Sequence, residues 1–235
     1  MSVRCSTLSP HKPTLTEENL PDQAGKVFLI TGASGGIGKE LVKILYLKNA
    51  KIWLAARSYS KTQAVINEIK AAHPTSTGEM IFLKLELDDL STIKASAQEI
   101  LSRETRLDVL WNNAGVMVPP QGSTTVQGHE LQLGINNLGH QLFTQLLTPL
   151  LERTSKVAPR DSVRVIWVSV GITRRNLVVA SGWRSVADGH KLASLHPFEI
   201  LPSIHTTSII NLYSYFAKIR DIAVFTLIIL TLISG

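Results

Sequence analysis

The sequence contains few of the residues that build disulfides, metal centres or export signals. Its single cysteine, Cys5, excludes an internal disulfide and any metal site made of cysteines. Its seven histidines show no metal-ligand spacing and no His-Glu-x-x-His motif occurs, so no metal is expected. Residues 1–22 are polar and lack an apolar core, so they do not read as a secretory signal peptide. We therefore expect a cytoplasmic protein.

Dense runs of one charge are also absent. The formal net charge is +6 and the pI is near 9.5, but the basic residues are spread along the chain. A mildly basic protein that handles an anionic small molecule explains this charge better than nucleic-acid binding does, so no nucleic-acid partner is expected. The 235 residues, 44% of them hydrophobic, allow one large domain with a proper core or at most two small ones.

A glycine-rich turn after a short apolar run organises the chain. Residues 26–30 are mostly apolar, Thr31 to Gly38 contain four glycines, and apolar residues at helical spacing follow. This pattern predicts a strand, a tight turn and a helix. Gly32 lets the chain leave the strand sharply, while Gly36 and Gly38 lack a Cβ, so that a pyrophosphate can approach the backbone. The N-terminus of the helix, with free N–H groups and a positive dipole end, favours that phosphate.

Strand and helix patterns alternate along the first 169 residues. Strands are predicted at 26–30, 51–56, 80–87, 107–111 and 162–169, and helices after the glycine turn and at 60–72, 91–103 and 132–151. Three successive strand–helix units imply a parallel sheet with helices on both faces. The predicted fold class is therefore α/β, with a doubly wound parallel sheet.

Two motifs resemble the short-chain dehydrogenase/reductase family. The T-G-x-x-x-G-x-G spacing from Thr31 to Gly38 resembles the family's cofactor turn, and Asn112-Asn113-Ala114-Gly115 resembles a second family motif at the end of a strand. The resemblance covers roughly residues 14–169 and is closest to the fungal or retinol-dehydrogenase-like branch. It implies a Rossmann-like fold and a nicotinamide cofactor. It also implies an oxidoreductase that interconverts an alcohol and a carbonyl, with lipophilic or secondary metabolites as substrates.

The resemblance also implies which residues hold the cofactor. Those at the glycine turn are Gly32, Ser34, Gly36, Ile37 and Gly38. Arg57 follows the second strand, where an acid would favour a free ribose 2′-hydroxyl, and a guanidinium there suits a 2′-phosphate. We therefore predict NADP(H) over NAD(H), with Lys61 adding charge; the alternative is that Arg57 is a solvated surface charge. Glu86 stands where the family has an aspartate that contacts the adenine. Asn113 is placed beside the cofactor, and its amide is expected to bond the neighbouring strand and close the turn.

The catalytic part of the resemblance is incomplete. Asn136 matches the family's asparagine that holds a water for a catalytic lysine; the alternative is a polar residue that bends the helix. The fifth strand ends in Ser169-Val170, so that valine stands where the family has its catalytic serine and Ser169 lies one residue early. His140 is expected to pack or hydrogen-bond rather than to react. The family's Tyr-x-x-x-Lys pair is missing, because the residues four after Tyr46, Tyr59, Tyr213 and Tyr215 are Ala50, Gln63, Ala217 and Ile219.

The sequence changes character after residue 170. We expect an N-terminal arm at 1–25, an NADP-binding domain at 26–170 and an atypical segment at 171–235. The sheet would then be incomplete on its C-terminal side, with an irregular hydrophobic tail, as a truncated or differently spliced reading frame would give. The apolar stretch 222–233 would reach only about 18 Å as a helix, whereas a bilayer core is about 30 Å thick. It is a docked tail, an interfacial membrane anchor, a sticky disordered end, or a cover for the edge of the fifth strand.

Three functions are consistent with these patterns. The first is an NADP(H)-dependent oxidoreductase acting on a small lipophilic alcohol or carbonyl. The second is a catalytically inactive remnant that binds NADP(H) weakly or not at all. The third is a membrane-associated protein that uses its C-terminal apolar tail. The oligomeric state is left open.

Overall fold

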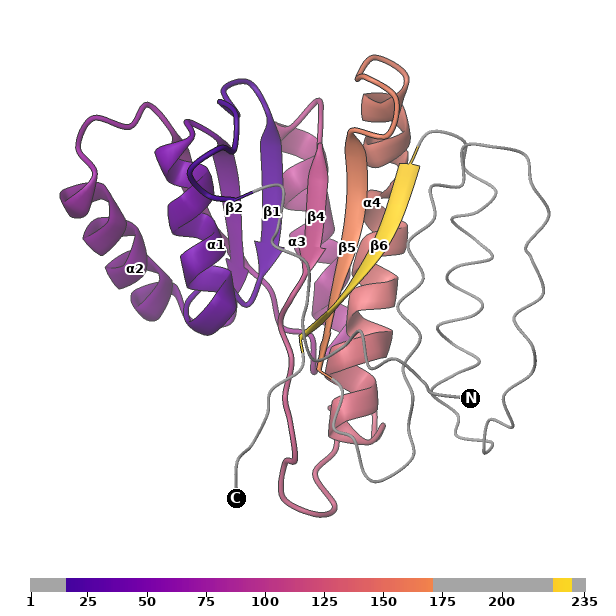
Figure 1. The fold of residues 1–235 in the computed structure, drawn as a ribbon. Helices are drawn as coiled ribbons and strands as arrows, with labels where there is room; N and C mark the ends of the chain where they lie inside the picture. Colours follow the sequence, from indigo (N-terminus) through magenta and orange to yellow (C-terminus); the bar gives the residue numbers. More distant parts are fainter. Residues whose placement is uncertain (1–15, 171–221, 230–235) are drawn as a thin grey trace, which may run out of the picture.

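A computed structural model describes residues 16–170 and 222–229, which form a sheet flanked by helices (Figure 1). The strands are β1 (Val27–Thr31), β2 (Lys51–Ala56), β3 (Glu79–Lys84), β4 (Val109–Asn112), β5 (Val163–Val170) and β6 (Ile222–Ile229). The helices are α1 (Gly36–Leu47), α2 (Tyr59–Ala72), α3 (Leu90–Arg103), the π-helix η2 (Leu133–Gly139) and α4 (His140–Ser155). Neighbouring strands pair in parallel in the order β3-β2-β1-β4-β5-β6, which confirms the predicted doubly wound sheet.

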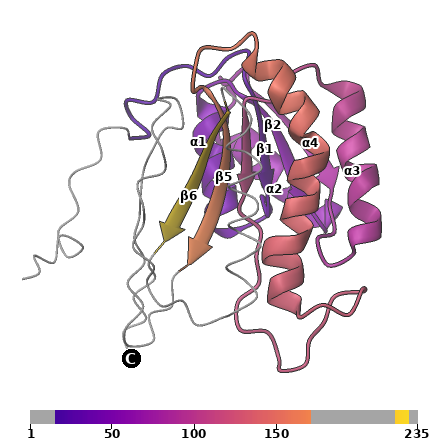
Figure 2. The same cartoon turned by 90° about the vertical axis from the view of Figure 1, so that its right-hand side faces the viewer.

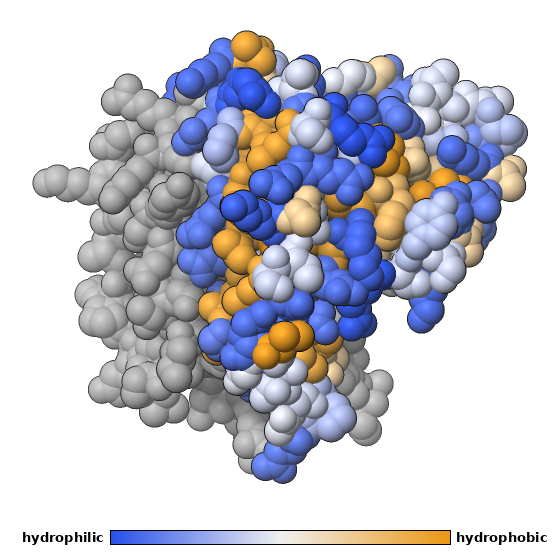
Figure 3. Space-filling view, turned by 180° about the vertical axis from the view of Figure 1, so that it is seen from behind, coloured by the Kyte–Doolittle hydropathy of each residue, from blue (hydrophilic) through white to orange (hydrophobic). Residues whose placement is uncertain are grey.

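Helices cover both faces of the sheet (Figure 2). One apolar cluster joins the sheet to α1 and α2, and includes Val42 and Ile66. The other joins it to α3 and α4, and includes Ile93 and Phe143. Every residue of β1 is buried, as expected of a central strand covered on both sides. Figure 3 shows the α3–α4 face from outside, where hydrophilic residues are interspersed with narrower apolar stripes.

The element types agree with the sequence patterns, while several boundaries differ. The second strand has the predicted bounds, but β3 ends at Lys84 rather than at 87 and β4 begins only at Val109. α3 begins at Leu90 because the carboxylate of Asp89 caps it, accepting from the Ser91 N–H at 3.0 Å. The helix predicted over 132–151 is divided at Gly139 into the π-helical segment η2 and α4.

Residues 222–229 of the apolar tail are not irregular. They form β6, which pairs with β5 along its whole length, from Val163 opposite Ile222 to Val170 opposite Ile229. Of the alternatives left open for the tail, the structure therefore has the one in which it covers the outer edge of the fifth strand. The segment 171–221 and residues 230–233 lie outside the described residues. Among the helices that the structure describes, none combines the length and the apolar character needed to cross a bilayer.

A buried carboxylate joins three strands at their amino ends. Asp108 is 2% exposed, and its side chain accepts from the Val27 N–H at 2.9 Å. It also receives two bonds from the Arg106 guanidinium, at 2.9 and 2.6 Å. Its backbone donates to the Val27 carbonyl and accepts from the Arg164 N–H. One residue thus sets the register of β1, β4 and β5, which fixes where their carboxyl ends lie.

Replacing Asp108 with alanine should lower the free energy of unfolding by about 2–3 kcal/mol, because a buried N–H and a guanidinium lose their acceptor. Urea denaturation measures this change. The control is Glu99→Ala, which removes an exposed ion pair to Arg103 (3.3 Å) and should cost at most about 0.5 kcal/mol. Equal losses for the two variants would contradict this role of Asp108.

Candidate functional site

The topology places a crevice at the carboxyl end of β1. β1 lies between β2 and β4, so the chain leaves β1 toward one edge of the sheet and later returns to its other side. In open parallel sheets, ligands bind outside the carboxyl ends of the strands at such a switch point. The glycine turn follows β1 and the Asn-Asn-Ala-Gly turn follows β4. The two motifs singled out in the sequence therefore meet at this position.

The glycines of the first turn are required for different physical reasons. Gly32 has φ +69°, and a Cβ on it would lie 2.9 Å from Ala114 Cα. A Cβ on Gly38 would lie 2.5 Å from the Gly32 carbonyl oxygen, so this glycine lets α1 pack against the end of β1. Gly36 has φ +52°, with no atom within 4 Å of where its Cβ would be. Two glycines thus permit close packing, and the third leaves an open approach to the backbone.

The start of α1 is suited to an anion. Gly35 occupies the N-cap position with an extended backbone and offers no side-chain cap, and the first turn contains no acidic residue. The N–H groups at the beginning of the helix therefore have no side-chain acceptor, which is the arrangement that binds phosphate. Ser34 is half-buried beside them, and Ile37 is 48% exposed at the mouth of the turn. Residues 34–38 thus form a cradle whose backbone fits a pyrophosphate.

The hydroxyl of Thr31 connects the two turns. Thr31 is fully buried at the end of β1, and its Oγ1 accepts from the backbone N–H groups of Asn113 and Ala114, each at 2.9 Å. The Asn113 amide in turn donates to the Thr31 carbonyl at 2.9 Å. This confirms the expectation that the asparagine bonds the neighbouring strand and closes the turn. The same hydroxyl lies 2.9 Å from Nε2 of His140, the first residue of α4.

These contacts assign the tautomer of His140. A hydroxyl oxygen has two lone pairs, and the two amides use both, so its own proton must point to an acceptor. His140 Nε2 lies at 2.9 Å and the Trp111 carbonyl oxygen at 3.3 Å. The shorter contact makes Nε2 the acceptor and Nδ1 the protonated nitrogen of a neutral ring, an assignment from the hydrogen-bond network. Burial lowers the pKa of His140 to about 4, against an opposing effect of the Asn136 and Ile135 carbonyls.

Packing also holds the His140 ring in place. It meets the Trp167 ring edge-on, with the two centroids 5.9 Å apart and an interplanar angle of 72°. Its Nδ1 has no hydrogen-bond partner of good geometry within the described part of the chain. The expectation that His140 packs and hydrogen-bonds is confirmed.

Asn136 fastens the loop that follows the second turn. It lies in η2, and its Oδ1 accepts from the Val116 N–H at 2.9 Å while its Nδ2 donates to the Val116 carbonyl at 2.8 Å. Gly115 provides the room, because a Cβ there would lie 3.2 Å from Asn136 Oδ1. Both ends of the amide are therefore engaged with backbone. A catalytic role of Asn136 stays a prediction.

Four charged residues gather where β2 and β3 end. Arg57 follows β2 and is exposed, as is Lys61 in the first turn of α2. Glu86 pairs with Lys84 at 2.6 Å, and the Lys84 ammonium also donates to the Arg57 carbonyl at 2.8 Å. The structure thus brings Arg57 and Glu86 to one edge through a lysine that the sequence reasoning missed. The sequence signal that could have identified Lys84 is a basic residue two positions before Glu86, at the end of a strand that neighbours β2.

Ser169 lies in the second-to-last position of β5, where its backbone is paired opposite Ile228. The structure describes no side chain at this position or at Val170, so a catalytic role for Ser169 also stays a prediction. Tyr213 and Tyr215 lie outside the described residues.

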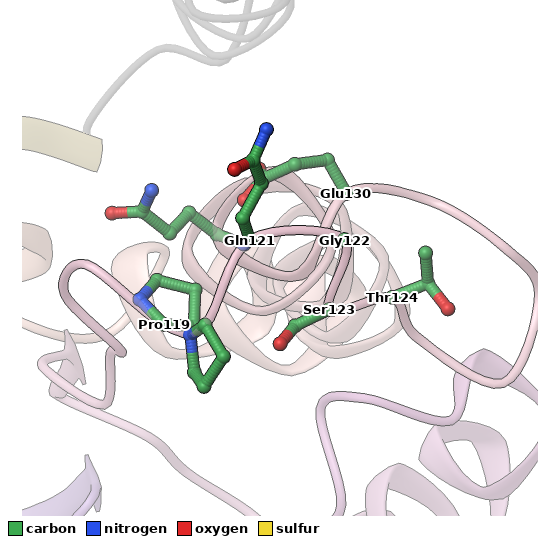
Figure 4. Close-up of a pocket in the computed structure, with 8 residues that line it drawn as sticks. Pro119, Gln121, Gly122, Ser123, Thr124 and Glu130 are labelled. Atoms are coloured by element: carbon green, nitrogen blue, oxygen red, sulfur yellow. The ribbon is translucent and has the colours of Figure 1, made fainter.

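A separate open pocket of about 390 Å³ lies in the loop between β4 and η2 (Figure 4). It is lined by Pro119, Pro120, Gln121, Gly122, Ser123, Thr124, Glu130 and Gln132. None of the residues predicted to bind a cofactor lines it. The segment 119–128 contains no helix or strand, apart from a single bridge between Thr124 and Glu130. Among the described residues, no group of acidic, histidine or cysteine side chains could hold a metal ion.

Comparisons with known proteins agree with this geometry. The sequence model of the family described as "short chain dehydrogenase" matches residues 26–181. A short-chain dehydrogenase/reductase of Phomopsis amygdali is 56% identical over 160 residues, which are 68% of this chain and 48% of that protein. The short-chain dehydrogenase/reductase pkfC of Emericella nidulans is 57% identical over 157 residues, 67% of this chain and 50% of that one. The chain therefore spans about half the length of these relatives.

Solved structures are similar over the same region. A metagenomic short-chain oxidoreductase in complex with NADP has a TM-score of 0.54 and 28% identity, and the match covers 66% of each chain. The Pseudomonas aeruginosa RhlG/NADP complex has a TM-score of 0.51 and 26% identity, covering 63% of this chain and 54% of that one.

Replacing Thr31 with valine should destabilise the fold by about 2–4 kcal/mol, because buried amides lose the acceptor that joins β1 to β4. Thr31→Ser is the matched control, since it keeps the hydroxyl and should cost about 1 kcal/mol or less. Chemical denaturation followed by tryptophan fluorescence measures both. A valine variant as stable as the serine variant would refute the role of the hydroxyl.

The burial of neutral His140 predicts an acid-sensitive stability. The unfolded chain protonates this histidine near pH 6.5, whereas the folded protein does so only near its pKa of about 4. Stability should therefore be complete above pH 6.5, fall by up to about 1.4 kcal/mol per pH unit between these values, and level off below them. Urea denaturation at pH 7.5, 6 and 5 tests this, with His140→Gln as the control that should flatten the slope. Long-range ¹⁵N–¹H NMR should show the proton on Nδ1, and a proton on Nε2 would overturn the assignment.

Proposed function

The chain belongs to the short-chain dehydrogenase/reductase family, and on that premise we propose that it binds NADP(H) at the glycine turn for an alcohol–carbonyl oxidoreduction. The observation that carries this proposal is Gly36. Its φ of +52° suits glycine, no atom lies within 4 Å of its absent Cβ, and it opens a helix with no side-chain cap. The bare backbone gives a pyrophosphate room to reach the first N–H groups of α1.

The bound dinucleotide would donate or accept a hydride at its nicotinamide ring. The residues of this chain bind and orient it. The first turn of α1 holds the pyrophosphate, and Thr31 and Asn113 keep the two turns in contact so that the cradle is formed beforehand. Glu86 would contact the adenine, as the aspartate at this position does in the family.

The preference for NADP(H) rests on charge at the end of β2. Arg57 stands where an acid would bind a free 2′-hydroxyl, and its guanidinium suits a phosphate. Lys61, four residues later in the first turn of α2, adds a second cation. Similar structures include complexes with NADP and one with NADH, so the choice rests on these charges alone.

A small lipophilic alcohol or carbonyl, of the kind found in secondary metabolism, is the proposed substrate. Apolar side chains support this class. Met117 is 54% and Val118 74% exposed, two and three residues after the Asn-Asn-Ala-Gly turn, and Ile37 is 48% exposed at the other turn. These exposed groups follow the two turns and offer apolar surface to such a substrate.

A second candidate function is cofactor binding without turnover. The specific observation is that none of the four tyrosines in this sequence has a lysine four residues later, and that Val170 stands in the place of a serine. In the family these groups move the proton that accompanies the hydride, and such help contributes about 10²- to 10⁴-fold to the rate.

Binding and turnover are tested separately. NADPH should raise the melting temperature of the full chain, because it binds the folded state. Gly36→Ala should weaken NADPH binding about tenfold or more, equivalent to about 1.4 kcal/mol, because a methyl group enters the pyrophosphate path. Gly25→Ala is the matched control, since Gly25 also has a positive φ (+77°) and open space but lies before the amino end of β1.

Both alanine variants should lose about 1 kcal/mol of stability from backbone strain, and only the first should lose affinity. Equal NADPH affinities for the two would contradict the proposed cradle. Loss of absorbance at 340 nm with a panel of ketones and aldehydes would support turnover. Binding without that loss would support the second candidate.

A further inference from the structure

Lys84 occupies an unusual position among the surface lysines. It is the last residue of β3 and pairs with Ala56, the last residue of β2. Its ammonium lies 2.8 Å from the Arg57 carbonyl oxygen and 2.6 Å from Glu86 Oε1. The side chain of a surface lysine is usually free to move. That of Lys84 is held by two contacts, one at the end of each strand. This places its charge beside the backbone of Arg57, whose own side chain is exposed.

The balance of charge at this edge favours an anion. Within the described residues neither the Arg57 guanidinium nor the Lys61 ammonium has an ion-pair partner, and Lys84 has one carboxylate. The ends of β2 and β3 and the first turn of α2 thus carry three cations, and one of them, Lys84, is paired with a carboxylate. Mutual repulsion of the cations is relieved when a further anion binds among them.

The Lys84–Glu86 pair can also exchange partners at little cost. Both side chains are partly solvated, at 56% and 38% exposure, so water stabilises each charge when the ion pair separates. A phosphate carries more negative charge than a carboxylate and offers three acceptor oxygens. An ammonium already placed by the Arg57 carbonyl can turn to it without losing that bond.

We propose that Lys84 is a third cation of the 2′-phosphate subsite, beside Arg57 and Lys61, and that Glu86 is the counter-ion that holds it while the phosphate is absent. This inference rests on the proposed function, because it concerns how the same site selects NADP(H). It assigns the discrimination between NADP(H) and NAD(H) to the end of β3 as well as to the end of β2. The glutamate at this position then acts on Lys84 as well as on the adenine.

The readout is the ratio of the dissociation constants for NADH and NADPH, measured by tryptophan quenching on the full chain. Lys84→Met should weaken NADPH binding about fivefold and change NADH binding by less than about twofold, since only NADPH carries the phosphate. Lys84→Arg should keep the wild-type ratio. Glu86→Gln should raise the ratio by about twofold, because it removes the competing carboxylate.

The matched control is Lys70→Met, which removes an exposed lysine from the last turn of α2, at the opposite end of that helix from Lys61. It should leave the ratio unchanged. If wild-type protein binds both cofactors and Lys84→Met leaves the ratio unchanged, the inference is wrong while the proposed function stands. If wild-type protein binds neither cofactor, the proposed function fails and this inference with it. Equal weakening of both cofactors by Lys84→Met would also overturn it, because that result means a structural role.

Discussion

The site depends on one buried hydroxyl. Thr31 Oγ1 accepts the backbone amides of Asn113 and Ala114 and contacts His140 Nε2, all at 2.9 Å. It therefore ties the end of β1 to the end of β4 and to the start of α4. These three elements are distant in sequence, and this contact, together with the bond from the Asn113 amide to the Thr31 carbonyl, fixes the spacing of the two turns. His140 accepts a hydrogen bond from this hydroxyl only while its ring is neutral. The geometry of the crevice is therefore linked to the protonation state of His140.

Around that contact, recognition is divided between backbone and charge. At the glycine turn the protein offers space and unpaired N–H groups, because Gly36 leaves its surroundings open and Gly38 lets the helix approach the strand. At the ends of β2 and β3 it offers cations instead. The first region suits the pyrophosphate common to nicotinamide dinucleotides, and the second suits the phosphate that distinguishes NADP(H). Affinity and selectivity are thus proposed to come from different segments of the chain.

The sequence was sufficient where the signal is local. Residue type and spacing predict the glycine turn, the bounds of β2 and the hydrogen bond from the Asn113 side chain to the neighbouring strand. It was insufficient where partners are distant or where two patterns compete. Asp89 rather than Ser91 caps α3, although both are good caps, and no local pattern shows that Lys84 reaches the Arg57 carbonyl. The pairing of residues 222–229 with β5 is also non-local: the sequence offered the edge of the fifth strand only as one of several places for the apolar tail, because a local pattern cannot choose among them.

The central claim is that the bare backbone at Gly36, spaced from β4 by Thr31, receives the dinucleotide. An ¹⁵N–¹H correlation spectrum of the full chain titrated with NADPH tests it most directly. The account predicts the largest amide shifts at Gly36, Ile37 and Gly38, with a second group at Arg57 and none at the amino ends of the strands. Saturating NADPH that leaves the amides of the glycine turn unmoved would contradict it.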